Sequence, residues 1–178
     1  MGSKPGKPPV EYTKENFERY VQRLGEKEWD WTTFASQGEY DKNLARAQIR
    51  MVGGSITGVH DGPDTVPPEH FTVSFMNVPP GNTVPSHGHP DVEEAFFILE
   101  GEGIGFWENP ETGEILEAKL GKHDLIMSPA HVMHGLKNTG DTDLIVQVLI
   151  GSQTPEKPYY VDDGLAGSQY AVHGQADK

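Results

Sequence analysis

The chain has 178 residues, which is enough for one domain with a sizeable core and short for two. Its 27 acidic residues outnumber its 14 lysines and arginines, so a net charge of −13 repels nucleic acid and anionic membranes. There is no cysteine, which excludes disulfides, thiolate ligands and a thiol nucleophile, so any metal must be held by nitrogen and oxygen atoms.

Targeting signals are not apparent in the sequence. No apolar run approaches the length of a membrane span, and the N-terminus lacks the apolar core of a signal peptide. We therefore expect a cytoplasmic protein with a small-molecule partner and with neither a membrane nor a nucleic-acid partner.

The first predicted unit is an N-terminal arm and helix over residues 1–46. Thr13 is a suitable N-cap for a helix over residues 14–24, and Gly25 is a suitable stop. The apolar residues recur at the spacing i, i+3, i+4 and i+7, which gives one stripe. That stripe consists of Phe17, Tyr20, Val21 and Leu24. We expect it to pack on the rest of the chain or on a neighbouring subunit.

From residue 47 onward, short apolar runs alternate with turn signals, which is typical of an antiparallel sandwich or barrel. Strands are predicted over residues 47–52, 71–78, 94–100, 103–108, 115–120, 125–127, 134–137 and 144–150. These strands form one unit over residues 47–151, without an internal repeat. The tail over residues 152–178 is mostly polar, and it either wraps a neighbour or is partly disordered.

The stretch over residues 81–101 gathers side chains that suit a metal. His87 and His89 lie two residues apart, which on an extended strand puts both imidazoles on one face. Glu94 opens the next apolar run, and His134 is a candidate fourth ligand. Two imidazoles and a carboxylate suit Fe, Mn, Ni or Zn. Each residue alone is equally an ordinary surface side chain, but that interpretation explains the set poorly.

Together these residues resemble the paired motifs of the cupin superfamily. The first motif is a glycine, five residues, His-x-His, three or four residues, Glu, six residues and a glycine. It is met in full by Gly81, His87, His89, Glu94 and Gly101. In the second motif Pro129, His134 and Asn138 match, whereas His123 and His131 occupy the positions of two glycines.

The resemblance covers residues 71–150 and implies an all-β fold, the cupin β-barrel or jelly roll (a double-stranded β-helix), here with an N-terminal helix and extended termini. It also implies one divalent metal ion per chain, with Fe(II) favoured and Mn, Ni or Zn as alternatives. The implied ligands are His87, His89, Glu94 and His134.

Strand parity predicts the surroundings of the site. If Glu94 points inward, so do Phe96 and Ile98, while Ala95, Phe97 and Leu99 point outward. The outward set is also apolar, so the helix or a second subunit must cover it, and we expect a homodimer.

Four residues are candidates for the substrate pocket, and one is a candidate for catalysis. Phe96, Ile98 and Trp107 either line a cavity or pack in the core. Gln147 either addresses substrate or bonds to backbone. His131 is either a proton donor at the mouth of the pocket or an exposed loop histidine.

Three functions remain open. The first is an Fe(II) dioxygenase that oxidises a small phenolic, enolic or diketone compound with O₂. The second is a non-redox isomerase, lyase or hydrolase that uses Mn, Ni or Zn as a Lewis acid. The third is a non-catalytic small-molecule binder or the small subunit of a larger oxygenase. All arginines precede residue 51, so the barrel offers at most Arg50, which favours an uncharged substrate over a polyanion.

Overall fold

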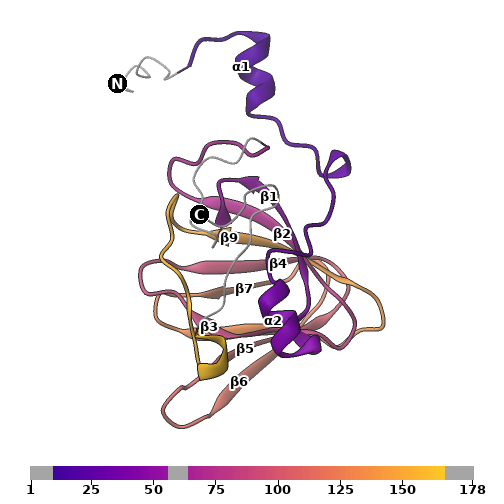
Figure 1. The fold of residues 1–178 in the computed structure, drawn as a ribbon, viewed down its shortest axis with the longest axis vertical. Helices are drawn as coiled ribbons and strands as arrows, with labels where there is room; N and C mark the ends of the chain where they lie inside the picture. The colour runs from indigo at the N-terminus through magenta and orange to yellow at the C-terminus, as the bar shows by residue number, and fades with distance from the viewer. Residues whose placement is uncertain (1–9, 56–63, 167–178) are drawn as a thin grey trace, which may run out of the picture.

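The computed structural model describes residues 10–55 and 64–166, and these residues form two antiparallel sheets that face each other (Figure 1). Sheet A has the strand order β1-β2-β9-β4-β7, and sheet B has the order β10-β3-β8-β5-β6. This arrangement confirms the predicted all-β jelly roll. Apart from β1–β2 and β5–β6, the neighbouring strands of each sheet are not consecutive in sequence, and residues from far-apart strands therefore meet in one interior.

The strands have the following bounds: β1 Ala47–Val52, β2 Thr72–Val78, β3 Thr83–Gly88, β4 Glu94–Glu100, β5 Gly103–Glu108, β6 Ile115–Leu120, β7 Leu125–Ser128, β8 Met133–Asn138, β9 Leu144–Ile150 and β10 Tyr159–Tyr160. The helices are α1 Lys14–Arg19 and α2 Ala35–Tyr40, with short 3₁₀ turns at Leu24–Glu26, Lys42–Leu44 and Asp163–Leu165. All eight predicted strands are present. β3 and β10 were not predicted, because β3 contains Pro85 and β10 has two residues in a polar tail.

The core lies between the sheets and follows the alternation of β4. Glu94, Phe96 and Ile98 are buried on its inner face, whereas Ala95, Phe97 and Leu99 are half-buried on its outer face. The parity prediction is therefore confirmed. Phe96 and Ile98 belong to one apolar cluster with side chains of β2, β8 and β9, and each fully buried side chain contributes about 1.5–3 kcal/mol.

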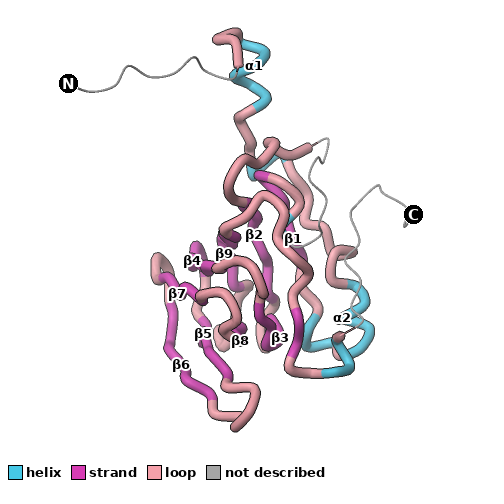
Figure 2. The backbone as a smooth tube through the Cα atoms, turned by 90° about the vertical axis from the view of Figure 1, so that its left-hand side faces the viewer, coloured by secondary structure: helices cyan, strands magenta, loops and turns pink. Residues whose placement is uncertain are grey.

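The N-terminal helix differs from the prediction in length and in place. Thr13 Oγ1 accepts a hydrogen bond from the Asn16 N–H at 3.1 Å, as expected of an N-cap, but α1 ends at Arg19 instead of Leu24. The helix buries none of its residues and stands apart from both sheets (Figures 1 and 2). A short helix without a packing surface gains nothing from extension. Phe17, Tyr20 and Leu24 of its stripe are exposed, whereas Val21 is half-buried.

The C-terminal tail lies along its own chain as far as residue 166. β10 pairs with β3, with Tyr160 opposite His87 and Tyr159 opposite Gly88. The Tyr160 hydroxyl accepts a hydrogen bond from Gln37 Nε2 in α2 at 2.8 Å. Within the described residues, no helix has the length and apolar character needed to cross a membrane.

Two histidines adopt a backbone conformation that glycine adopts in the cupin motif. His123 and His131 have φ values of 76° and 68°, in the left-handed region that side chains with a Cβ disfavour. The turn of the second motif is thus kept despite the loss of both glycines. The side chains of both histidines are exposed, although the His123 ring stacks on Phe97.

We predict that His131→Gly raises the melting temperature of the metal-free protein by about 1–4 °C. Relief of left-handed strain outweighs the greater freedom of glycine in the unfolded chain by about 0.5–1 kcal/mol. His123→Gly should gain less, because the His123 ring stacks on Phe97 at 6.3 Å and 17°.

The control is His70→Gly, since His70 is exposed and is not among the described residues with positive φ. Thermal denaturation in a chelator measures all three variants. A fall in melting temperature for His131→Gly, or an equal rise for His70→Gly, would contradict the strain account.

Candidate metal centre

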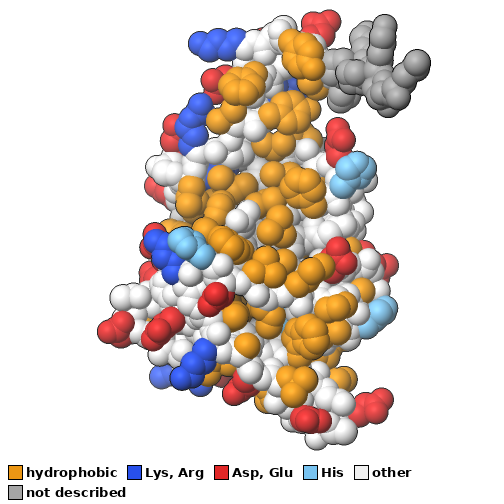
Figure 3. All heavy atoms as spheres, turned by 180° about the vertical axis from the view of Figure 1, so that it is seen from behind, with side chains coloured by type: hydrophobic (Ala, Val, Ile, Leu, Met, Phe, Trp, Pro, Cys, Tyr) orange, Lys and Arg blue, Asp and Glu red, His pale blue; other side chains and the backbone are white. Residues whose placement is uncertain are grey.

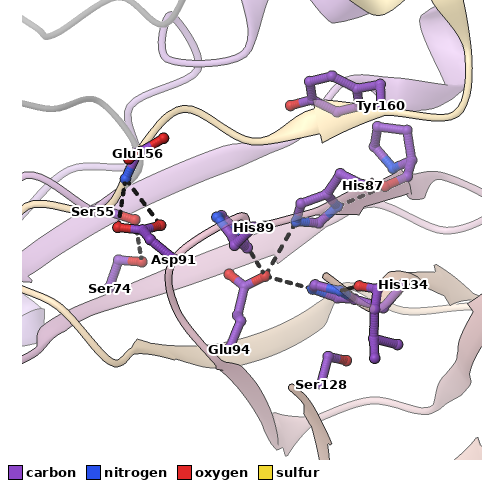
Figure 4. Close-up of polar contacts among 12 residues, drawn as sticks. Ser55, Ser74, His87, His89, Asp91, Glu94, Ser128, His134, Glu156 and Tyr160 are labelled. Atoms are coloured by element: carbon purple, nitrogen blue, oxygen red, sulfur yellow. Dashed lines mark hydrogen bonds and ion pairs between the residues drawn. The ribbon is translucent and has the colours of Figure 1, made fainter. Parts of the chain in front are cut away.

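Four titratable side chains meet inside the jelly roll from both sheets (Figure 4). Glu94 is the first residue of β4 in sheet A. His87 in β3 and His134 in β8 are opposite each other in the ladder of sheet B, and His89 follows directly after β3. All four are at least 95% buried, and His89 is only 1% exposed. The structure therefore brings together the four predicted ligands.

One carboxylate oxygen is the focus of the three imidazoles. Glu94 Oε2 lies 2.7 Å from His134 Nε2, 3.1 Å from His87 Nε2 and 3.3 Å from His89 Nε2. One ligand atom from each residue lies within 4.8 Å of the others. Two atoms bound at about 2.1 Å to one ion, at right angles, are about 3 Å apart. The spacing of the four donors therefore fits one metal ion.

The outer nitrogens fix the orientation of two rings. His87 Nδ1 donates to the Pro85 carbonyl at 2.8 Å, and His134 Nδ1 donates to the Val132 carbonyl at 2.9 Å, because a carbonyl oxygen can only accept. The proton of each neutral ring is thereby placed on Nδ1, and the Nε2 lone pair faces Glu94. The Nε2 lone pairs of His87 and His134 repel the Glu94 carboxylate unless a cation lies between them.

His89 provides the clearest sign of a missing partner. Both of its ring nitrogens are buried without a hydrogen-bond partner, although Nε2 approaches Glu94. A buried polar nitrogen left unpaired costs free energy, so native structures rarely retain one. A divalent ion bound to Nε2 removes half of this deficit, and the residues present therefore fit a metal.

The pKa values of His87 and Glu94 favour the charge states that bind a metal, whereas Glu94, against the effect of burial, raises the pKa of His134. Burial, reinforced by repulsion from His134, lowers the pKa of His87 to about 4, so this ring is neutral at pH 7. Burial alone would raise the pKa of Glu94, but the three histidine rings around its carboxylate hold it well below its ordinary value. Glu94 is therefore ionised, and one of the two charges of a divalent ion is neutralised.

The candidate pocket residues lie at different depths. The Phe96 ring is 5.7 Å from the His134 ring, so Phe96 forms a wall of the site. Trp107 is opposite His134 in the β5–β8 ladder, and its Nε1 donates to Ser128 Oγ at 3.0 Å. Ile98 is fully buried in the core, beyond Phe96 along β4.

Two candidates lie away from the metal ligands. Gln147 is opposite Phe97 in the ladder of sheet A, so it shares the outer face of the sheet, whereas Glu94 is on the inner face. This register corrects the prediction that Gln147 faces the pocket. The His131 side chain is exposed, while its backbone N–H donates to the His89 carbonyl at 2.8 Å. Its role as a proton donor stays a prediction.

Tyr160 is a neighbour of the site that the sequence did not indicate. Its ring lies 5.9 Å from the His87 ring, on the strand that pairs with β3. The sequence predicted only a mostly polar tail over residues 152–178, and nothing in the spacing of its residues pointed to the metal ligands.

The comparisons with known proteins agree with this geometry. The family model described as "Cupin domain" matches residues 74–150. These residues belong to the cupin superfamily. The match ends with β9, so the N-terminal arm and the tail that carries β10 lie outside the cupin match.

Similar proteins differ in their named functions. Germin-like protein subfamily 2 member 1 of Arabidopsis thaliana is 28% identical over 133 residues, which is 71% of this chain and 58% of that protein. This chain thus spans less than two thirds of that relative. An oxalate-binding protein of Thermotoga maritima is 38% identical over 69 residues, covering 39% of this chain and 52% of that protein.

Among solved structures, Peruvianin-I of Thevetia peruviana latex, described as a cysteine peptidase, has a TM-score of 0.60 at 15% identity. The match covers 87% of this chain and 83% of that one, and it supports the fold alone. This chain has no cysteine.

We predict that His89→Ala lowers the metal content of the purified cupin at least tenfold, because one of four ligands is lost from a closed site. The fold should survive, since the ring has no hydrogen bond to lose. Elemental analysis measures the metal per chain, with His70→Ala as the control. Full metal occupancy in His89→Ala would refute the ligand assignment.

We also predict that the metal-free cupin loses stability between pH 6.5 and pH 4.5. The unfolded chain protonates His87 below about pH 6.5, whereas the folded chain resists protonation until about pH 4, so acid favours unfolding by about 1–2 kcal/mol. The raised pKa of His134 changes the stability only above pH 6.5, and the lowered pKa of Glu94 changes it only below pH 4.5. Neither group therefore contributes much to the slope in this window.

Melting temperatures measured in a chelator at several pH values check this prediction. The variant His87→Gln should flatten the profile. An identical slope in the variant and in the unaltered protein would show that another group is responsible.

Proposed function

We propose that this cupin is a mononuclear non-haem Fe(II) dioxygenase that oxidises a small phenolic, enolic or diketone compound. The observation that carries the proposal is the convergence of three imidazole nitrogens on one buried carboxylate oxygen, at 2.7–3.3 Å. Three neutral nitrogens and one carboxylate suit iron and leave an octahedral ion two further positions. Such an ion supplies Lewis-acid stabilisation of an anionic substrate oxygen and, as Fe(II), electrons for chemistry with O₂.

The chain's own residues set the charge of the site. Glu94 contributes one negative charge and the neutral rings contribute none, so the loaded centre carries a net charge near +1. A phenolate or enolate oxygen is negatively charged and is therefore attracted to this centre. The positive charge also lowers the pKa of the substrate hydroxyl, so its proton is lost more easily. Burial of the ligands strengthens this attraction, because the local dielectric is low.

The walls favour an uncharged organic molecule. Phe96 lies beside His134, and Val148 is the neighbour of Phe96 in the ladder of sheet A. Arg50 is already paired with Asp30 at 3.4 Å, and the Arg46 guanidinium lies over the Phe34 ring at 3.8 Å. Neither arginine therefore offers a spare charge to a polyanion.

A second candidate is the binding of a small carboxylic acid without turnover. It is supported by the relative named oxalate-binding protein, which shares 38% identity over 69 residues. A carboxylate would bind the net positive metal centre directly and would need no arginine. The cytoplasmic location expected from the sequence stays a prediction under either function.

The test is to reconstitute the protein anaerobically with Fe(II) and to record oxygen consumption with catechols, hydroquinones and 1,3-diketones, and with oxalate. We expect oxygen uptake with one of the first three classes, loss of uptake with Zn(II) in place of Fe(II), and loss in His89→Ala. Saturable binding of oxalate without oxygen uptake from any compound would favour the second candidate. Turnover that is equal with Zn(II) and Fe(II) would indicate non-redox isomerase or lyase chemistry.

A further inference from the structure

One row of side chains crosses sheet B next to the metal ligands. Tyr160 is opposite His87, His87 is opposite His134, and His134 is opposite Trp107. Residues that are directly opposite in an antiparallel ladder project from the same face of the sheet. All four side chains are therefore on the inner face, and the two imidazoles lie between two aromatic residues.

Both aromatic side chains are anchored at their outer ends to other elements. Trp107 Nε1 donates to Ser128 Oγ in β7 of sheet A at 3.0 Å. The Tyr160 hydroxyl accepts a hydrogen bond from Gln37 Nε2 in α2 at 2.8 Å, and Gln37 is fully buried. Side chains whose tips are fixed in this way can hold a neighbouring ligand in one orientation. Trp107 belongs to the residues that the family model matches, whereas Tyr160 lies outside them.

The Tyr160 ring covers the side of His87 that faces away from His134. The ring centroids of His87 and His134 are 4.5 Å apart, and those of His87 and Tyr160 are 5.9 Å apart at an interplanar angle of 34° (Figure 4). Both separations are in the range of packed aromatic pairs. Among the described strands, β10 is the edge strand on this side of sheet B. Loss of the Tyr160 ring would therefore open the edge of the metal centre to water.

The tail around Tyr160 is fixed by contacts that do not involve the metal ligands. The Val161 N–H donates to the Ser86 carbonyl in β3 at 3.3 Å. The Tyr40 hydroxyl at the end of α2 donates to the Asp162 carboxylate at 3.1 Å. These contacts tie the tail to β3 and to α2, so the fold sets the place of Tyr160 whether or not an ion is bound.

We propose that Tyr160 is a positioning residue that holds the His87 imidazole toward the ion and slows the release of that ion. The hydrogen bond from His87 Nδ1 to the Pro85 carbonyl places the ring proton, but a single bond does not stop the ring from tilting. The Tyr160 ring blocks that movement on one side and excludes water there. Groups that orient a ligand and control solvent access typically change metal affinity by roughly 10- to 100-fold. This role depends on the four ligands and not on the reaction proposed above.

The test is the rate at which EDTA removes Co(II) from the loaded protein, followed by the visible absorption of the bound ion. We expect Tyr160→Ala to lose Co(II) about tenfold faster or more, because the open edge admits water and lets His87 leave the ion. Tyr160→Phe should stay within about threefold of the unaltered protein, since it retains the ring and loses only the hydroxyl. The Co(II) spectrum should shift in Tyr160→Ala and not in Tyr160→Phe, because only the first variant changes the geometry around the ion.

The matched control is Tyr159→Ala in the same strand. Tyr159 is opposite Gly88, so its ring is on the other face of sheet B, and it is 40% exposed. The substitution removes the same atoms from the same short strand but leaves the side of His87 covered, so the rate and the spectrum should be unchanged. Equal acceleration in Tyr159→Ala and Tyr160→Ala would show that attachment of β10 matters and not the Tyr160 ring, and would overturn the proposal.

Other sites for Co(II) should contribute little to this measurement. Seen from behind, the histidine side chains at the surface lie apart from one another (Figure 3). Within the described residues, the four ligands are the one group of three or more His, Asp or Glu side chains whose spacing suits an ion. An unaltered protein that does not take up one Co(II) per chain would contradict the ligand assignment and the role of Tyr160 together.

A second variant, Tyr160→Leu, decides the matter if Tyr160→Ala does not fold. It keeps an apolar side chain without a ring, so it should lose Co(II) faster than Tyr160→Phe. A rate in Tyr160→Leu equal to that in Tyr160→Phe, or an unchanged rate and spectrum in folded Tyr160→Ala, overturns the role of the ring. No step of the measurement involves turnover, so the dioxygenase reaction can fail the oxygen-uptake test while Tyr160 keeps its role, and the reverse also holds.

Discussion

The structure depends on a buried cluster in which three imidazoles surround one carboxylate. Such a cluster is unfavourable by itself, because the side chains lose water and two rings direct lone pairs at an anion. A cation among the four donors reverses the balance, since every nitrogen then faces a positive charge. The ladder of sheet B contributes by holding His87 opposite His134 before any metal arrives. The two sheets therefore act as a rigid frame around a site that needs a cation.

Much of this centre is predictable from the sequence, because the spacing of its ligands follows from strand geometry. His87 and His89 are two residues apart, which fixes a common face whatever the rest of the fold does. Glu94 begins a strand whose alternation places Phe96 and Ile98 inward. These predictions hold in the structure because they depend on local strand geometry, with which no tertiary contact competes.

The errors occur where tertiary contacts decide the outcome. The side of the sheet that Gln147 occupies depends on its register with Phe97, and its apolar neighbours on both faces give no alternation to read. The length of α1 depends on packing, and α1, which buries none of its residues, ends at Arg19. β10 exists only because β3 has a free edge, and a two-residue strand has no periodicity of its own. His123 and His131 show that a turn survives the loss of its glycines when the surrounding ladders fix it.

The central claim is that His87, His89, Glu94 and His134 together hold one divalent ion. Anomalous diffraction from crystals of the protein as purified, recorded on both sides of the metal absorption edge, tests it most directly. The account predicts one anomalous peak per chain, about 2.0–2.2 Å from three Nε2 atoms and one Glu94 oxygen. A metal peak bound elsewhere, with these four side chains hydrogen-bonded only to one another, would contradict it.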